Sequence, residues 1–153
     1  MVVLADELFR EIQLQLQMGH MTSFTISGMS MWPFLCHGRD QVILKAARPE
    51  LLKKGAIVLL RKDDGSYLVH RITGIREDYI QTTGDGKLCR DGWFRKDQIL
   101  AVADQVVRKG RTISCSSIGW KVQSALWMSA WPIRKELLWM MGGILRVSRR
   151  IRE

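Results

Sequence analysis

The strongest constraint on the fold is a series of short β-prone runs that begins near residue 22. The runs cover residues 22–26, 41–44, 56–60, 67–72, 79–82 and 99–107. Asp63-Asp64-Gly65-Ser66 separates two of them and predicts a tight hairpin, because an Asp-Gly pair suits the backbone of such a turn. No helical pattern interrupts the runs, so the sequence predicts a mainly β fold built from an antiparallel, coiled or barrel-like sheet.

Helical segments are predicted on both sides of these runs. Residues 3–18 place their apolar side chains at a spacing of three to four, which puts them on one helical face that we expect to pack on the main body. These side chains are Leu4, Leu8, Phe9, Ile12 and Leu16. After Val107, residues 118–147 suggest one or two helices broken at Pro132. We therefore divide the chain into a helix at 1–20, a β-domain at 21–108 and a Trp-rich helical tail at 109–153.

The positive charge belongs to this tail. Of the net charge of +9, residues 108–153 contribute +8, with 10 Lys or Arg and 2 Asp or Glu. The longest uncharged runs of the tail, at 122–133 and 137–145, contain 12 and 9 residues. A helix that spans a bilayer needs about 20 apolar residues. We therefore expect no transmembrane helix in this tail.

Two interpretations of the tail remain open. Tryptophan-rich apolar faces with flanking cations would suit a helix that lies on an anionic membrane surface, here through residues 118–152. The other interpretation is a helix packed on the β-domain with a solvated basic end. The flanking cations are Lys121, Arg134, Lys135, Arg146, Arg149, Arg150 and Arg152. Binding of nucleic acid is the less favoured use of these charges, because charge runs are usually solvated faces.

The cysteines and the N-terminal residues both favour a reducing, intracellular compartment. Three cysteines without a C-x-x-C pair predict no disulfide framework, and the spacing of the histidines and cysteines predicts no zinc site. Charged residues at positions 6, 7, 10 and 11 interrupt any secretory apolar run. We expect a cytoplasmic protein, with peripheral attachment to the inner membrane face as an option.

The segment Ser27-Gly28-Met29-Ser30-Met31-Trp32-Pro33 holds the candidate chemistry. Gly28 allows a bend beside Ser30, and Met31, Trp32 and Pro33 could wall a substrate cleft together with Gly28. A serine hydroxyl becomes a nucleophile only with a base in reach, and His70 is the candidate base. The N–H of Ser30 is the natural first donor to an oxyanion.

Ser30-Met31-Trp32-Pro33 resembles the S-M-x-P nucleophile box of type I signal peptidases. Glycine turns and apolar strands follow in the order of that family, at Gly38-Arg39-Asp40-Gln41-Val42-Ile43 and Lys54-Gly55-Ala56-Ile57-Val58. His70-Arg71 then resembles the branch whose base is histidine. The resemblance covers about residues 20–108. It implies the partly open barrel of the LexA and signal peptidase superfamily, a peptide substrate bound as an extended strand, and no cofactor.

The same resemblance implies the third member of a triad. Within Thr83-Gly84-Asp85-Gly86-Lys87-Leu88-Cys89-Arg90-Asp91, Asp91 takes the position of the aspartate that orients the histidine. Asp85 is the second choice, as a turn residue. Met29 adds one residue between Ser27 and Ser30 relative to the S-G-S-M box of signal peptidases, which weakens Ser27 as a further oxyanion donor.

These residues predict a serine endopeptidase that cleaves a leader, signal or pro-peptide. In the main alternative the chain is a catalytically inactive peptidase fold, with a basic tail that binds membrane or nucleic acid. A LexA-like regulator ranks lower: Ser27 to Met31 match its S-G-M-S-M box, but such proteins carry an upstream DNA-binding domain and use lysine where this chain has His70.

Overall fold

The structure is a computed structural model that describes residues 2–150, with the side chains of residues 6–142. Its strands are β1 (Thr22–Thr25), β2 (Asp40–Ala46), β3 (Ile57–Arg61), β4 (Tyr67–Arg76), β5 (Tyr79–Thr83), β6 (Gly92–Arg95), β7 (Ile99–Arg108) and β8 (Arg111–Ser114). The predicted mainly β fold is confirmed. Each of the six runs predicted from the sequence overlaps one of these strands, whereas β6 and β8 were not predicted.

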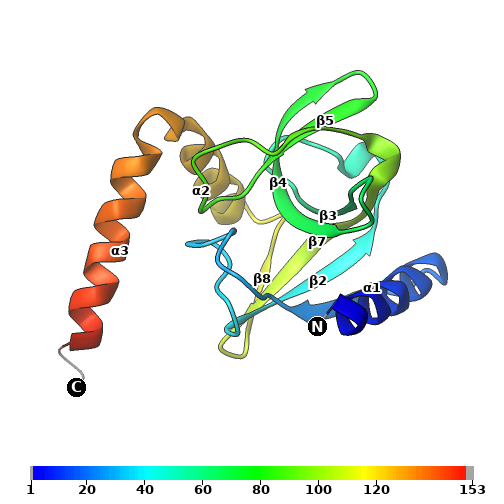
Figure 1. The fold of residues 1–153 in the computed structure, drawn as a ribbon, viewed down its shortest axis with the longest axis horizontal. Helices are drawn as coiled ribbons and strands as arrows, with labels where there is room; N and C mark the ends of the chain where they lie inside the picture. Colours follow the sequence, from blue (N-terminus) through cyan, green and yellow to red (C-terminus); the bar gives the residue numbers. More distant parts are fainter. Residues whose placement is uncertain (1, 151–153) are drawn as a thin grey trace.

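The strands form one antiparallel sheet in the order β1-β2-β7-β3-β4-β5-β6, with β8 also paired to β7. Within the described residues β1 and β6 have one partner strand each, so the sheet is not closed. Figure 1 shows β3, β4 and β5 curling around one end of the molecule. The predicted hairpin joins β3 to β4, where Lys62 N–H donates to the Ser66 carbonyl over 2.8 Å and Gly65 has a φ of 85°.

Strand β3 divides the interior into two apolar cores. Ile57 and Leu59 point into the larger core with β2 and the N-terminal helix, whereas Val58 and Leu60 point into the smaller core with β4 and β5. This division follows from the alternation of side chains along a strand. All four residues are at most 2 % exposed, so β3 is buried on both faces.

The described residues form three α-helices outside the sheet: α1 (Val2–Gln17), α2 (Ile118–Ser129) and α3 (Arg134–Arg150). Helix α1 packs on the body as predicted, with Ile12 and Leu16 in the larger core and Phe9 stacked on Tyr67 at 4.2 Å between ring centroids. The turn η3 (Trp131–Ile133), which includes Pro132, separates α2 from α3. Figure 1 shows α2 beside the sheet and α3 running away from it.

The tail is partly integrated into the body. Strand β8 extends the sheet beyond residue 108, and Trp120 and Trp127 of α2 are 6 % and 8 % exposed. Arg134, one of the cations expected to flank the apolar faces of the tail, does not face solvent. Arg134 is 2 % exposed, with its guanidinium over the rings of Trp127 and Trp131. Arg146, Arg149, Arg150 and Arg152 lie outside the described side chains.

Two further observations concern surfaces. Within the described part of the chain, no helix combines the length and apolar character needed to cross a bilayer.

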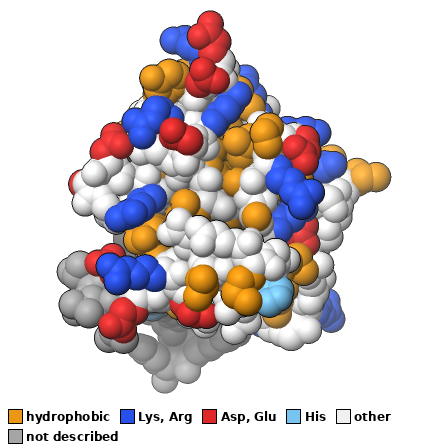
Figure 2. Space-filling model, turned by 90° about the vertical axis from the view of Figure 1, so that its right-hand side faces the viewer, with side chains coloured by type: hydrophobic (Ala, Val, Ile, Leu, Met, Phe, Trp, Pro, Cys, Tyr) orange, Lys and Arg blue, Asp and Glu red, His pale blue; other side chains and the backbone are white. Residues whose placement is uncertain are grey.

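Figure 2 shows one face of the molecule, on which acidic and basic side chains are interspersed around a central group of hydrophobic side chains. This face therefore does not gather charge of a single sign.

Candidate active site

Ser30 lies on a bend between β1 and β2. Gly28 has a φ of 83°, which L side chains rarely adopt, and its N–H donates to Nδ1 of His37 over 2.9 Å. Trp32 N–H donates to the carbonyl of Met29, closing a turn around Ser30. The bend holds the Ser30 side chain half-buried at the surface. His37 was not among the predicted site residues, and nothing in its sequence spacing identified it.

His70 lies on β4 and contacts Asp91 directly. Nδ1 of His70 and Oδ2 of Asp91 are 2.5 Å apart, and the same carboxylate oxygen accepts the Thr82 hydroxyl over 2.8 Å. A carboxylate accepts hydrogen bonds, so in a neutral imidazole this contact places the proton on Nδ1 and leaves the lone pair on Nε2. Because His70 is 1 % exposed, its ring is fixed in this orientation.

Asp91 is held in its ionised form. Burial raises the pKa of this carboxyl, but the hydrogen bonds from His70 and Thr82 and the charge of Lys87 outweigh burial and lower the pKa below its usual value. The carboxylate is therefore available to orient the imidazole at neutral pH. The His70–Asp91 contact is the pairing that the sequence resemblance implied.

The turn Gly84-Asp85-Gly86 joins the Ser30 bend to His70. Gly86 N–H donates to the carbonyl of Ser30 over 2.9 Å. A Cβ on Gly84 would lie 2.5 Å from that carbonyl oxygen and 3.0 Å from Nε2 of His70. The Ser30 backbone and the free nitrogen of His70 are thus neighbours on one side of Gly84. Only glycine fits at positions 84 and 86, because the Ser30 bend passes so close that a Cβ at either position would meet its backbone oxygens.

Asp85, the second choice as the orienting aspartate, does not contact His70. Its carboxylate accepts two hydrogen bonds from Arg71, from Nε over 2.8 Å and from the second guanidinium nitrogen over 2.7 Å. Arg71 and Asp85 are 0 % and 1 % exposed. His70 and Arg71 are adjacent on β4, where successive side chains face opposite sides. Asp85 is therefore the partner of Arg71, and it anchors the turn that contacts Ser30.

Helix α2 completes this anchor. Arg71 donates to the hydroxyl of Ser124 over 2.7 Å, and Trp127 Nε1 donates to the carbonyl of Asp85 over 3.1 Å. Phe34, four residues after Ser30, has its ring under the Arg71 guanidinium at 4.9 Å. Ser124 and Trp127 are not predicted site residues. Their spacing on one helical face was the only sequence signal, and it indicates burial without naming the partner.

The segment after the bend has its own anchor at Asp40. Arg39 and Arg108 both donate to this buried carboxylate, as does the N–H of Cys36. Burial raises the pKa of Asp40, but these hydrogen bonds lower it to about 2. Arg108 also donates to the carbonyl of Phe34. Arg108, the last residue of β7, thereby holds both ends of residues 34–40.

The other predicted residues occupy different environments. Met31 is 2 % exposed and packs in the larger core, so its side chain is a core contact. Trp32 and Pro33 are half-buried, and Ser27 and Gly28 are exposed. Among the described residues, no hydrogen bond joins the Ser30 side chain to His70, and none is donated by the Ser30 N–H.

The chain matches no protein-family model, and no curated protein is significantly similar to it. The geometry of the site is therefore the basis for a functional assignment.

Proposed function

We propose that the chain is a serine endopeptidase in which Ser30 is the nucleophile, His70 the general base and Asp91 the residue that orients the base. The observation that carries the proposal is the buried His70–Asp91 contact, with Nε2 of His70 beside the Ser30 backbone at Gly84. This arrangement follows the order of nucleophile, base and orienting group that acyl transfer needs.

The reaction would proceed through an acyl-enzyme. Nε2 of His70 takes the proton of the Ser30 hydroxyl while Oγ attacks the peptide carbonyl carbon. His70 then gives that proton to the leaving amine as the C–N bond breaks, and a water repeats the sequence to release the acid. The missing Ser30–His70 hydrogen bond would form with substrate bound, because such contacts are often long in unliganded enzymes.

The bend offers a donor for the developing oxyanion. Among the described residues the Ser30 N–H has no acceptor, so it is free to bind a negatively charged oxygen. Ser27 is exposed three residues earlier, and no contact of its side chain supports a second donor there.

A substrate could add to the sheet as an extended strand. Strand β1 is at one end of the sheet order and leads into the bend five residues before Ser30. A peptide paired with such an edge gains main-chain hydrogen bonds, and side-chain pockets supply selectivity. On the sequence resemblance to the histidine branch of type I signal peptidases, we infer a leader, signal or pro-peptide as the substrate class and a LexA-like, partly open barrel as the fold.

Acylation by a fluorophosphonate tests the proposal without a known substrate. The protein should be labelled at Ser30, and Ser30→Ala or His70→Ala should lower the labelling rate by on the order of 10⁴-fold. Ser27→Ala is the matched control, because this exposed serine lies on the same bend. Unchanged labelling of Ser30→Ala would falsify the assignment, and absence of labelling in the folded protein would favour the inactive binding module.

We also propose that the helical tail contacts an anionic membrane surface. Ile118, Val122 and Leu126 form an exposed stripe on α2, and Trp139 of α3 is 79 % exposed. The test is flotation with vesicles containing phosphatidylserine. Replacing the three stripe residues by Gln should reduce flotation severalfold, whereas Leu88→Gln, an exposed apolar residue in the loop after Gly86, should leave it unchanged. Equal flotation of both variants would contradict the proposal.

A further inference from the structure

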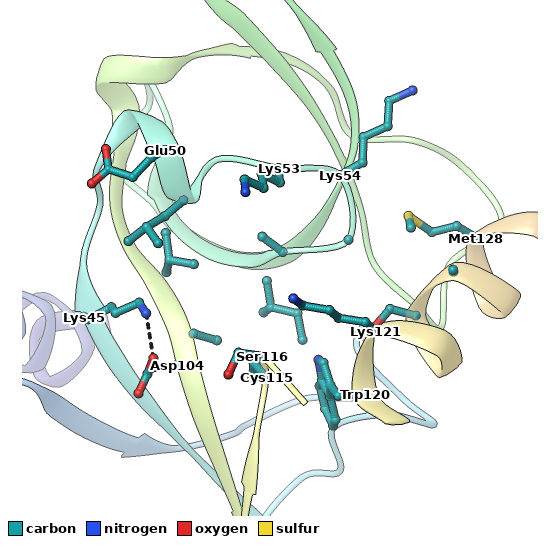
Figure 3. Close-up of a pocket in the computed structure, with 18 residues that line it drawn as sticks. Lys45, Glu50, Lys53, Lys54, Asp104, Cys115, Ser116, Trp120, Lys121 and Met128 are labelled. Carbon is teal, nitrogen blue, oxygen red and sulfur yellow. Dashed lines mark hydrogen bonds and ion pairs between the residues drawn. The ribbon is translucent and has the colours of Figure 1, made fainter. Parts of the chain in front are cut away.

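A pocket with no part in the proposed peptidase lies between the sheet and α2 (Figure 3). Its volume is about 470 Å³, within the usual range of about 300–1,000 Å³ for small-molecule sites. Strands β2, β3 and β7, the loop before β3 and helix α2 all supply lining residues. The pocket is separate from Ser30, His70 and Asp91, none of which lines it.

The floor of the pocket is apolar. Ile57, Val102 and Trp120 are at most 6 % exposed, and Met128 forms part of the wall. Cys115 also lines the pocket, but burial raises the pKa of its thiol to about 11, with Asp104 adding to the effect. The thiol is therefore protonated and unreactive at neutral pH. The floor is suited to contact with hydrocarbon, without covalent chemistry.

The rim of the pocket is positively charged. Lys45, Lys53, Lys54 and Lys121 line it, against two carboxylates, Glu50 and Asp104. Lys45 pairs with Asp104 over 2.7 Å, whereas Lys53 and Lys121 have no ion-pair partner among the described side chains. Figure 3 shows the ammonium groups of Lys53 and Lys121 directed toward the hollow and that of Lys54 directed away from it.

We propose that this pocket binds an anionic amphiphile, a molecule with one carboxylate or phosphate group on an unbranched apolar body. The apolar body lies on the Ile57, Val102 and Trp120 floor, where it leaves water. The anionic group lies between Lys53 and Lys121, which approach from the β3 loop and from α2. A neutral ligand would use the floor alone, and an inorganic anion would use the rim alone.

Calorimetric titration of the full-length protein tests this assignment with four probes: laurate, dodecyl phosphate, dodecanol and inorganic phosphate. Laurate or dodecyl phosphate should bind at one site per chain and at least tenfold more tightly than dodecanol or inorganic phosphate. The tighter of the two amphiphiles identifies the head group. Laurate should bind about tenfold more tightly than decanoate, because two more methylene groups are buried.

Variants of the rim and the floor separate the two contributions. Lys53→Gln with Lys121→Gln should weaken laurate binding about tenfold and leave dodecanol binding unchanged, with Lys62→Gln with Lys96→Gln as the control pair outside the pocket. Ala125→Phe, which fills the pocket from α2, should abolish binding, whereas Val122→Phe on the same helix should not. Absence of binding by both laurate and dodecyl phosphate would overturn the proposal. Binding of the tighter amphiphile that neither the lysine pair nor Ala125→Phe weakens would overturn it as well. Ser30→Ala should bind laurate normally, so this outcome is independent of the peptidase assignment.

Discussion

Arg71 holds Asp85 by two parallel hydrogen bonds of 2.8 and 2.7 Å, with both side chains shielded from water. The neighbour of Arg71 on β4, His70, contacts Asp91 on the other side of the strand. Two adjacent residues thus fix both ends of the segment 85–91. The turn within this segment contacts the carbonyl of Ser30, so the position of the proposed nucleophile depends on both pairs.

Replacing Arg71 by Met should lower the free energy of unfolding by about 3–5 kcal/mol, because it leaves the Asp85 carboxylate buried without a partner. Urea unfolding followed by circular dichroism measures this change. Arg95→Met is the control, since the exposed Arg95–Asp97 pair should contribute no more than about 1 kcal/mol. Adding Asp85→Asn to Arg71→Met should restore part of the loss. If Arg71→Met were as stable as the parent protein, the anchoring role of the pair would be refuted.

Gly84→Ala should displace the Ser30 bend, because its Cβ would lie 2.5 Å from the Ser30 carbonyl oxygen. We expect a loss of about 1–3 kcal/mol in stability and a decrease in fluorophosphonate labelling on the order of 100-fold. Gly119→Ala in α2 is the matched control, because its Cβ would meet no atom within 4 Å. Normal labelling of Gly84→Ala would show that the close approach does not position the nucleophile.

Asp91→Asn should lower the labelling rate by on the order of 10³- to 10⁴-fold while the fold persists, because a carboxamide no longer fixes the His70 proton on Nδ1. The rate constant for labelling, with circular dichroism as the check on folding, measures this effect. Asp85→Asn should have the opposite effects: it should lower the free energy of unfolding, while the protein that remains folded should be labelled at nearly the parent rate. A triad that used Asp85 as the orienting residue would reverse the two results.

Asp40 should make stability depend on pH between about 4 and 2. Its pKa in the folded protein is about 2, below the ordinary value of 3.8, so the ionised form stabilises the fold. This stabilisation is complete above the unfolded pKa and is lost as the pH falls through the folded pKa. The difference in unfolding free energy between the parent protein and Asp40→Asn should be constant above pH 5 and shrink toward pH 2. A difference that does not change with pH would exclude this linkage.

The strands that the sequence predicted share a strong local signal. The runs at 56–60 and 99–107 are rich in Val, Ile and Leu, and Asp64-Gly65 marks the hairpin without reference to the rest of the chain. Strands β6 and β8 were missed because they have four residues each, with Arg and Ser among them, and form by pairing with β5 and β7. Strand β6 pairs with β5 across residues 84–91, and β8 pairs with β7 across the two-residue turn Lys109-Gly110. Both short strands therefore depend on the strand beside them more than on a pattern of their own.

The local sequence around Ser30 determined that a glycine bend precedes the serine, and the alternation along β4 determined that His70 and Arg71 face opposite ways. Only the tertiary structure decided which aspartate each residue contacts, because Asp85 and Asp91 lie on one irregular segment whose path is set by Arg71, α2 and β5. The burial of Arg134 was decided in the same way. The sequence shows that Arg134 is positively charged. Only the structure shows that its guanidinium lies over the indole rings of Trp127 and Trp131. Local periodicity fixes the direction of a side chain, whereas long-range packing fixes what it meets.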